Sequence, residues 1–354
     1  MITQPAMTPP MPRRSRRHAA ALLALVFGPP ALAQLTPDRA YYGVNRPIPM
    51  TITVPDGADG EVRIDLFEPG KTEPGATAPA LAGPVDLAGL FPVLWQGPSP
   101  RMRYAQLVVG GEQVGAPVVI QPMVTPPKAV LIDPATNRVW YTDPATKEEN
   151  FKPNEGRLVW TTEPPAYSGV RAYADQHAVF VTSLGEIEVR LRPDAAPNSV
   201  WNFRELARGG FYTDIIVHRI VPRLPTGHPF VVQVGDPTGT GDGGPGFSFD
   251  LERSTLPHDF GILSLARSAD PNTNGSQVFF ALSREGTQKL DGRYTAFGEA
   301  VRGDDVLLSF EKVKVTGDRP DEPPMLKSVR LIDAPPWNKR PPALKRPASG
   351  PAKR

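Results

Sequence analysis

The chain has 354 residues, of which 44 are proline and 32 are glycine. Its length is ample for two domains, and the many turn-forming residues disfavour long helices, so we expect a mainly β protein. Cysteine is absent, which excludes disulfides and thiolate chemistry, and the histidines are scattered without metal-ligand spacing. We therefore predict neither a metal nor a cofactor.

Residues 1–33 have the features of a secretory signal peptide. Four arginines from Arg13 to Arg17 precede an apolar run, Ala19 to Phe27, that is too short for a bilayer span of about 20 residues. Cleavage after Ala33 would leave 35 basic residues of the original 39 against 37 acidic ones, a net charge of −2 instead of +2. This balance predicts export to the periplasm or medium and no specific affinity for nucleic acid.

Residues 34–168 contain spaced strand-like runs separated by turns rich in Pro, Gly, Asp and Asn. Val62 to Leu66, for example, alternates apolar and charged residues, as a strand with one buried face does. Several such runs in succession favour a β-sandwich of immunoglobulin-like type. No catalytic constellation lies in this region, so we expect a spacer or adaptor domain of unknown role.

Residues 169–334 show the pattern of a second domain. Runs at 178–181 and 186–191 predict a hairpin, and Pro197 begins a helix that Gly209-Gly210 ends. A second helix is expected near Asp304-Asp305, since acidic residues suit the positive end of a helix. The boundary between the domains is placed in the Pro-rich linker before Gly169.

Residues 335–354 are basic and rich in proline and contain no acidic residue. Such a segment buries too little apolar area to offset the entropy cost of ordering it. We predict a disordered, solvated tail.

Residues 218–297 form the most distinctive stretch of the chain, because several short β-rich runs there carry one polar group (Arg219, Gln233, Gln277) beside apolar or aromatic residues. The densest run is His218 to Pro222, and it is resumed at Phe230 to Asp236. Further blocks follow at 239–241, 261–267, 274–280 and 290–298. This mixture of side chains suits a shallow groove better than a core.

In order and spacing, these blocks resemble the cyclophilins, which are peptidyl-prolyl cis/trans isomerases. The resemblance covers residues 177 to 334 and implies a closed eight-stranded β-barrel capped by two helices. It also implies an isomerase that acts on X-Pro segments of folding proteins. No nucleophile, metal or cofactor is required for that reaction.

The resemblance also implies roles for individual residues. Arg219 matches the catalytic arginine, and Gln233 matches the glutamine that orients the substrate backbone. The implied substrate-binding residues are Phe230, Val231, Ala266, Gln277, Phe279, Leu290 and Tyr294. Phe230, Phe279 and Leu290 would wall the proline pocket, while Ala266 and Gln277 would contact residues before the proline.

The sequence departs from the usual family pattern in several places. Seven residues, Arg223 to Pro229, separate Pro222 from Phe230 where the family commonly has one. Val231 replaces a common Met, Lys289 stands where many members have a large aromatic residue, and Tyr294 replaces a common His. These changes bear on cyclosporin-like ligands more than on isomerisation.

Two functions remain open on the sequence alone. The first is an exported isomerase that assists the folding of secreted or envelope proteins. The second is a non-catalytic cyclophilin-like module that binds Pro-containing segments. The G-x-G-x-x-G match at 239–244 is no dinucleotide site, because Pro245 follows it and no βαβ unit surrounds it.

Overall fold

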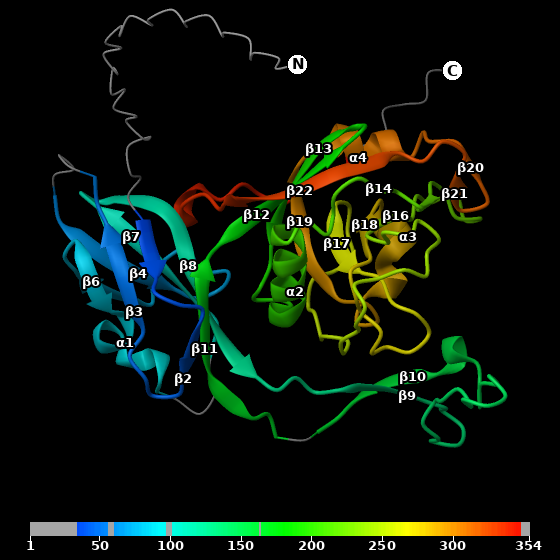
Figure 1. Ribbon diagram of the computed structural model, residues 1–354, viewed down its shortest axis with the longest axis horizontal. Coiled ribbons are helices and arrows are strands. Elements are labelled where there is room, and N and C mark those ends of the chain that lie inside the picture. The colour runs from blue at the N-terminus through cyan, green and yellow to red at the C-terminus, as the bar shows by residue number, and fades with distance from the viewer. Residues whose placement is uncertain (1–33, 56–59, 97–100, 163, 348–354) are drawn as a thin grey trace, which may run out of the picture. The chain divides into compact units, whose positions relative to one another are not determined.

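The computed structural model describes residues 34–55, 60–96, 101–162 and 164–347. The expected signal peptide at 1–33 and the last residues of the expected tail, 348–354, lie outside that range. Strands outnumber helices throughout the described chain (Figure 1), which confirms the mainly β class.

The first part of the chain forms two antiparallel sheets over one hydrophobic core. The larger has the order β2 (Tyr41–Gly43), β11 (Tyr167–Ala174), β8 (Glu112–Val124), β7 (Arg103–Val109), β4 (Val62–Phe67) and β5 (Ala76–Pro79). The smaller has the order β1 (Gln34–Pro37), β3 (Pro49–Thr53) and β6 (Gly83–Asp86), followed by α1 (Leu87–Leu90) and η1 (Pro92–Leu94). Met50 of β3 and Leu107 of β7 belong to the same buried cluster. The immunoglobulin-like type of this region stays a prediction.

A two-stranded arm leaves the larger sheet between β8 and β11. It consists of β9 (Ala129–Ile132) and β10 (Arg157–Trp160), with η2 (Pro153–Glu155) between them. We call residues 129–160 the hairpin arm. Asn272 Nδ2 donates to the Ala129 carbonyl at 2.8 Å, so the arm contacts the second part of the chain.

The second part of the chain is built on one nine-stranded sheet. Its order is β14 (Ile215–Ile216), β22 (Met325–Asp333), β12 (Gln176–Thr182), β13 (Gly185–Leu191), β19 (Ala296–Arg302), β17 (Ile262–Leu265), β18 (Val278–Ala281), β16 (Val231–Val234) and β15 (Arg219–Val221). The expected hairpin at 178–191 is confirmed by the pairing of β12 with β13. The edge strands β14 and β15 are joined by only Val217 and His218, so the sheet must curl to bring its edges together. Closure into the eight-stranded barrel that we expected is not confirmed.

Two helices pack against the core of this sheet. The predicted helices are α2 (Pro197–Arg208) and α4 (Asp304–Phe310), and the structure confirms both. Phe203 and Phe310 belong to the main buried cluster. Gly303 precedes α4 with φ 93°, and a Cβ there would lie 2.5 Å from the Glu186 carbonyl oxygen, so this corner needs glycine. The remaining short elements are α3 (Arg284–Thr287), η3 (Gln288–Leu290), β20 (Val315–Thr316), β21 (Arg319–Pro320) and η4 (Trp337–Lys339).

The boundary expected near residue 168 is wrong. Tyr167–Ala174 is strand β11, which pairs with both β8 and β2 of the first sheet, so the change from one sheet to the next falls at Asp175. Pro164 and Pro165 suggested a linker, but the residues after them form a strand that is defined by its pairing. The error arose because proline marks where a strand begins as readily as where a domain ends.

The disorder expected after residue 335 is also wrong for residues 335–347. Trp337 stacks on Phe67 with ring centroids 5.1 Å apart, and its backbone N–H donates to Gln106 Oε1 at 2.9 Å. Farther on, Arg346 pairs with Glu311 at 2.6 Å. Partners elsewhere in the chain therefore supply the burial that the segment's own composition lacks.

Two observations concern the described ranges only. None of their helices has the length and apolar character that crossing a membrane requires. Nor do they contain a cluster of three or more acidic, histidine or cysteine side chains suited to a metal ion.

Candidate active site

Three neighbouring strands bring the predicted catalytic residues together. In the antiparallel pairing of β15, β16 and β18, Arg219 lies opposite Gln233 and Gln233 lies opposite Phe279. Directly opposed residues of antiparallel strands project from the same face of the sheet. The groove residues therefore meet because of strand register, although the chain segments that supply them lie far apart.

A central pocket of about 180 Å³ opens on this face. It is lined by Arg219, Phe230, Val231, Gln233, Ala266, Arg267, Phe279, Leu290 and Tyr294. Every predicted site residue except Gln277 is among them, and Arg267 is an addition. Sites for drug-sized ligands measure about 300 to 1,000 Å³, so this pocket suits one small apolar side chain.

Phe279, which lines the central pocket and forms its floor, packs against a buried histidine. Phe279 stacks on His258 with centroids 5.8 Å apart and planes at 14°, and Tyr294 meets Phe279 edge-on at 5.8 Å. The His258 ring nitrogens lie 3.0 Å from Asp291 Oδ1 and 2.9 Å from Ser264 Oγ. Burial lowers the pKa of His258 despite the opposing influence of Asp291, so the ring is neutral at neutral pH. These contacts fix the orientation of the floor.

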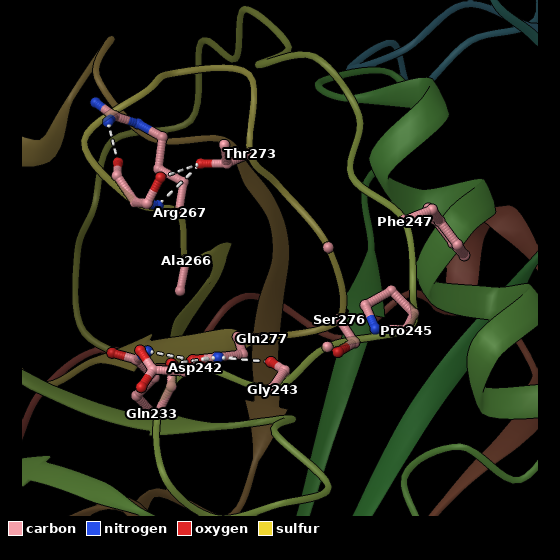
Figure 2. A pocket seen from close by; sticks show the side chains of 14 residues that line it. Gln233, Asp242, Gly243, Pro245, Phe247, Ala266, Arg267, Thr273, Ser276 and Gln277 are labelled. Carbon is pink, nitrogen blue, oxygen red and sulfur yellow. Dashed lines mark hydrogen bonds between the residues drawn. The ribbon is translucent and has the colours of Figure 1, made fainter. Parts of the chain in front are cut away.

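A chain of hydrogen bonds crosses the groove beside the pocket. Arg219 Nη1 donates to Gln233 Oε1 at 3.2 Å. Gln233 Nε2 donates to Gln277 Oε1 at 2.7 Å (Figure 2). Gln277 Nε2 then donates to the carbonyls of Gly241 and Gly243, at 2.7 and 2.9 Å. The amide of Gln233 is therefore held in one orientation, with its oxygen toward Arg219.

Asp236 anchors the glycine-rich loop at the far end of this chain of bonds. Its carboxylate accepts from the N–H of Thr238 at 2.7 Å and from the N–H of Gly241 at 2.6 Å. Burial works against ionisation, but the bonds from Thr238 and from backbone N–H groups outweigh it and hold the pKa of Asp236 well below its usual range. A Cβ at Gly243 would lie 1.9 Å from Asp236 Oδ1. The loop thus needs its glycine for close packing, and no phosphate need be invoked.

A second cavity of about 420 Å³ lies over this loop (Figure 2). We call it the glycine-loop cavity. It shares Gln233, Ala266 and Arg267 with the central pocket, and Gln277 lines it. Gln277 and Ala266 therefore lie beside the opening of the central pocket, and their contact with residues before the proline stays a prediction.

Asp318 is a groove residue that sequence reasoning missed. Its Oδ2 accepts from Arg219 Nε at 3.0 Å and lies 2.9 Å from Nη2. The residue sits in the turn between β20 and β21, far from the motif blocks. Gly317-Asp318 has the composition of an ordinary tight turn, so nothing local in the sequence marks it as a partner of Arg219.

Arg267 is the second residue that was missed. Its guanidinium lies 4.6 Å from the centroid of the Tyr294 ring and donates to the Arg293 carbonyl through Nε at 3.1 Å and Nη2 at 3.0 Å. Burial lowers its pKa. Its position directly after Ala266 was the available signal, because that block already pointed to the groove.

The inserted loop 223–229 lies beside the pocket, as its place in the sequence suggested. It is closed by a hydrogen bond from the Leu224 N–H to the His228 carbonyl at 2.8 Å. Leu224 packs against the buried cluster that contains Phe279 and Leu290. The insertion therefore adds apolar contact behind the pocket wall.

Comparison with known proteins identifies the class. Residues 177–331 match the family model described as cyclophilin type peptidyl-prolyl cis-trans isomerase/CLD. Over 160 residues, the chain is 42% identical to peptidyl-prolyl cis-trans isomerase-like 1 of Aspergillus oryzae, and the match covers 44% of the chain and 94% of that relative. The chain belongs to the cyclophilin-type peptidyl-prolyl cis-trans isomerase family.

Two further relatives show how far the similarity extends. The chain is 36% identical over 202 residues to peptidyl-prolyl cis-trans isomerase-like 2 of Cryptococcus neoformans, covering 54% of the chain but only 34% of that relative's length. A solved cyclophilin type peptidyl-prolyl cis-trans isomerase from Cryptosporidium parvum, in the presence of the dipeptide Ala-Pro, is 33% identical. That match covers 45% of the chain and 99% of the other, with a TM-score of 0.41.

Proposed function

We propose that the protein catalyses cis/trans isomerisation of X-Pro bonds, with the prolyl ring in the central pocket. The observation that carries the proposal is the position of Arg219 at a small apolar pocket walled by Phe230, Phe279 and Leu290. A charged donor beside a pocket for one apolar ring is the arrangement that this reaction needs. The family membership of residues 177–331 supports the same conclusion.

The chemistry follows from the amide bond itself. Rotation about an X-Pro bond meets a barrier of about 18 to 20 kcal/mol, because amide resonance must be broken. In the twisted state the prolyl nitrogen is pyramidal and basic and can accept a hydrogen bond that the planar amide cannot. A donor fixed near that nitrogen stabilises the twisted state selectively and so accelerates the reaction.

Arg219 has donors left for that task. A guanidinium carries five N–H groups. Nε donates to Asp318, and Nη2 forms an ion pair with the same carboxylate. One N–H of Nη1 donates to Gln233. Among the described residues, the second N–H of each terminal nitrogen has no protein partner within hydrogen-bond distance. Asp318 and Gln233 thus orient the fork while leaving two donors for a substrate.

Gln233 and Gln277 would hold the substrate backbone, and Val231, Ala266 and Tyr294 would complete the contacts around the proline. These roles are proposals that rest on position. Since Gln233 and Gln277 are already hydrogen-bonded to each other, they are pre-oriented, which lowers the entropy cost of binding an extended peptide.

The test is two-dimensional NMR exchange on the full chain with an excess of an Ala-Ala-Pro-containing peptide. Catalysis gives exchange cross-peaks between cis and trans resonances within milliseconds to seconds, where the uncatalysed reaction takes tens to hundreds of seconds. Shift changes without exchange would instead favour the second candidate, a non-catalytic module that binds Pro-containing segments. The retained Arg219 favours the first.

We also propose export to the periplasm or medium, where the clients would be folding secreted or envelope proteins. The support is the arginine-rich start and short apolar run of residues 1–33. An immunoglobulin-like type for residues 34–168, serving as a docking or spacer half, belongs to the same proposal. N-terminal sequencing of the mature protein from a native extract tests export: a start at Gln34 is expected, and an intact leader in a cytosolic fraction would contradict it.

A further inference from the structure

A third cavity, of about 530 Å³, adjoins the central pocket on the side of the hairpin arm. We call it the hairpin cavity. Its lining residues are Leu131, Pro153, Arg267, Ser268, Ala269, Lys289, Leu290, Arg293 and Tyr294. Arg267, Leu290 and Tyr294 also line the central pocket, so the two spaces are continuous. Gln277 and the glycine loop do not line the hairpin cavity, which distinguishes it from the space assigned to residues before the proline.

The walls of the hairpin cavity come from two separate parts of the chain. Leu131 belongs to β9 and Pro153 to η2 of the hairpin arm, whereas the other lining residues belong to the isomerase domain. The arm is tied to that domain by the bond between Asn272 and the Ala129 carbonyl and by the ion pair of Lys128 with Asp250 at 3.8 Å. The cavity therefore exists because the arm contacts the domain next to the groove.

The charged residues that line this cavity are all positive. Three cationic residues line it, Arg267, Lys289 and Arg293, and none of its described lining residues is acidic. Lys289 and Arg293 are exposed, and neither forms an ion pair with any residue that the structure describes. The Lys289 ammonium lies 5.5 Å from the centroid of the Phe230 ring, which places a positive charge against the wall of the central pocket. Asp270, whose charge tends to raise the pKa of Arg267, lines a separate cavity next to the hairpin arm.

The geometry points to a subsite for client residues that follow the proline, selective for a carboxylate side chain. A peptide whose proline fills the central pocket and whose preceding residues cross the glycine-loop cavity would continue into the hairpin cavity. There an Asp or Glu side chain meets cations without a competing acidic group, while Leu131 and Pro153 cover the apolar part of the segment. This inference rests on the proposed function, because it assumes that the proline occupies the central pocket.

The experiment uses the full chain and pairs of neutral-ended peptides that carry Glu or Gln at the first, second or third position after the proline. Catalytic efficiency is measured by NMR exchange, and affinity by chemical-shift titration. Screened ion pairs near a surface are individually weak. We therefore expect a preference for Glu over Gln of about two- to tenfold at one or more positions, shrinking in about 1 M salt, where the Debye length is about 3 Å.

Three variants locate the effect. The double variant Lys289→Gln/Arg293→Gln should bring the Glu-to-Gln ratio close to one, whereas the control Arg253→Gln/Lys312→Gln, at exposed cations outside the three cavities, should keep it. Pro153→Asp puts a carboxylate on the arm side of the cavity and should lower the ratio if the arm covers the subsite. An unchanged ratio in Pro153→Asp would remove the arm from the inference.

The outcomes separate the inference from the proposed function. Catalysis of every peptide with a Glu-to-Gln ratio near one in the unaltered protein overturns the acidic subsite but leaves the isomerase intact. Absence of catalysis with any peptide overturns the proposed function, and the titrations then still decide the subsite through the ratio of affinities. A ratio that survives in the Lys289→Gln/Arg293→Gln variant also overturns the subsite.

Discussion

The groove and the C-terminal segment 335–347 are held in place by different kinds of contact, strand pairing in the first and side-chain contacts with distant residues in the second. The groove residues lie together because each motif block carries its own polar and apolar residues and strand pairing brings the blocks into register. The C-terminal segment was expected to be disordered, yet Arg340 pairs with the buried Asp175 and stacks 3.9 Å over Trp337. The composition of a segment indicates how much apolar area it can bury by itself, but not which contacts it makes with residues far away in the chain.

The largest effect is expected at Arg219. Replacing Arg219 by Ala should lower catalytic efficiency by about two to three decades, or roughly 3 to 4 kcal/mol for one lost donor in a preorganised site. Arg219→Lys should recover little, because a point charge on a flexible stem cannot reproduce the planar fork that Asp318 and Gln233 hold in place. The rate constants are measured by NMR exchange. Full activity in Arg219→Lys would show that only charge matters and would contradict the orienting roles.

The next largest effect is expected in the C-terminal segment, at Arg340. The Asp175 side chain is only 5% exposed, and Arg340→Ala removes its ion-pair partner. The free energy of unfolding should therefore fall by about 3 kcal/mol. Burial already raises the pKa of Asp175. Urea unfolding measures the change, and Lys345→Ala, at an exposed residue of the same segment, should alter stability by less than about 0.5 kcal/mol. Equal stability of the two variants would show that Arg340 does not hold the segment in place and would support a disordered tail.

A smaller effect is expected at Asp318, which orients Arg219 without touching the substrate. Both partners are partly exposed, 36% for Arg219 and 53% for Asp318, so their ion pair is screened. Asp318→Asn should lower catalytic efficiency by about two- to fivefold with little change in peptide affinity. Glu322→Gln, at a neighbouring exposed carboxylate, serves as the control. A loss as large as that of Arg219→Ala would give Asp318 a direct catalytic role instead.

The smallest effect concerns stability at low pH. Burial opposes ionisation of Asp291, but hydrogen bonds from Arg284 and from His258 outweigh it and lower its pKa to about 2. The folded state therefore binds this proton less readily than the unfolded chain, whose Asp pKa is about 3.9. The stability contributed by Asp291 is complete above about pH 4 and is lost as pH falls toward 2. Its pH-dependent part should be missing in Asp291→Asn, which urea unfolding at several pH values can check.

Much of the isomerase domain could be predicted, and the reason is physical. Helix α2 carries its own start and stop residues, and α4 carries acidic residues in its first turn. The hairpin of β12 and β13 shows the alternation of a half-buried pair. The domain boundary could not be predicted, because β11 is recognised only by its pairing with β8 and β2. Asp318 and the hairpin arm were missed for the same reason, since their importance lies in what they contact rather than in their own sequence.

The central claim is that Arg219 acts on the twisted amide while the pocket acts on the ground state as well. It is tested most directly by measuring, for Arg219→Ala and Phe279→Ala, both peptide affinity by NMR titration and turnover of bound peptide by NMR exchange. The account predicts that Arg219→Ala loses turnover with affinity nearly kept, whereas Phe279→Ala loses affinity together with catalytic efficiency. Equal losses of affinity in the two variants, with turnover of bound peptide unchanged in Arg219→Ala, would contradict it and leave a binding module in place of the enzyme.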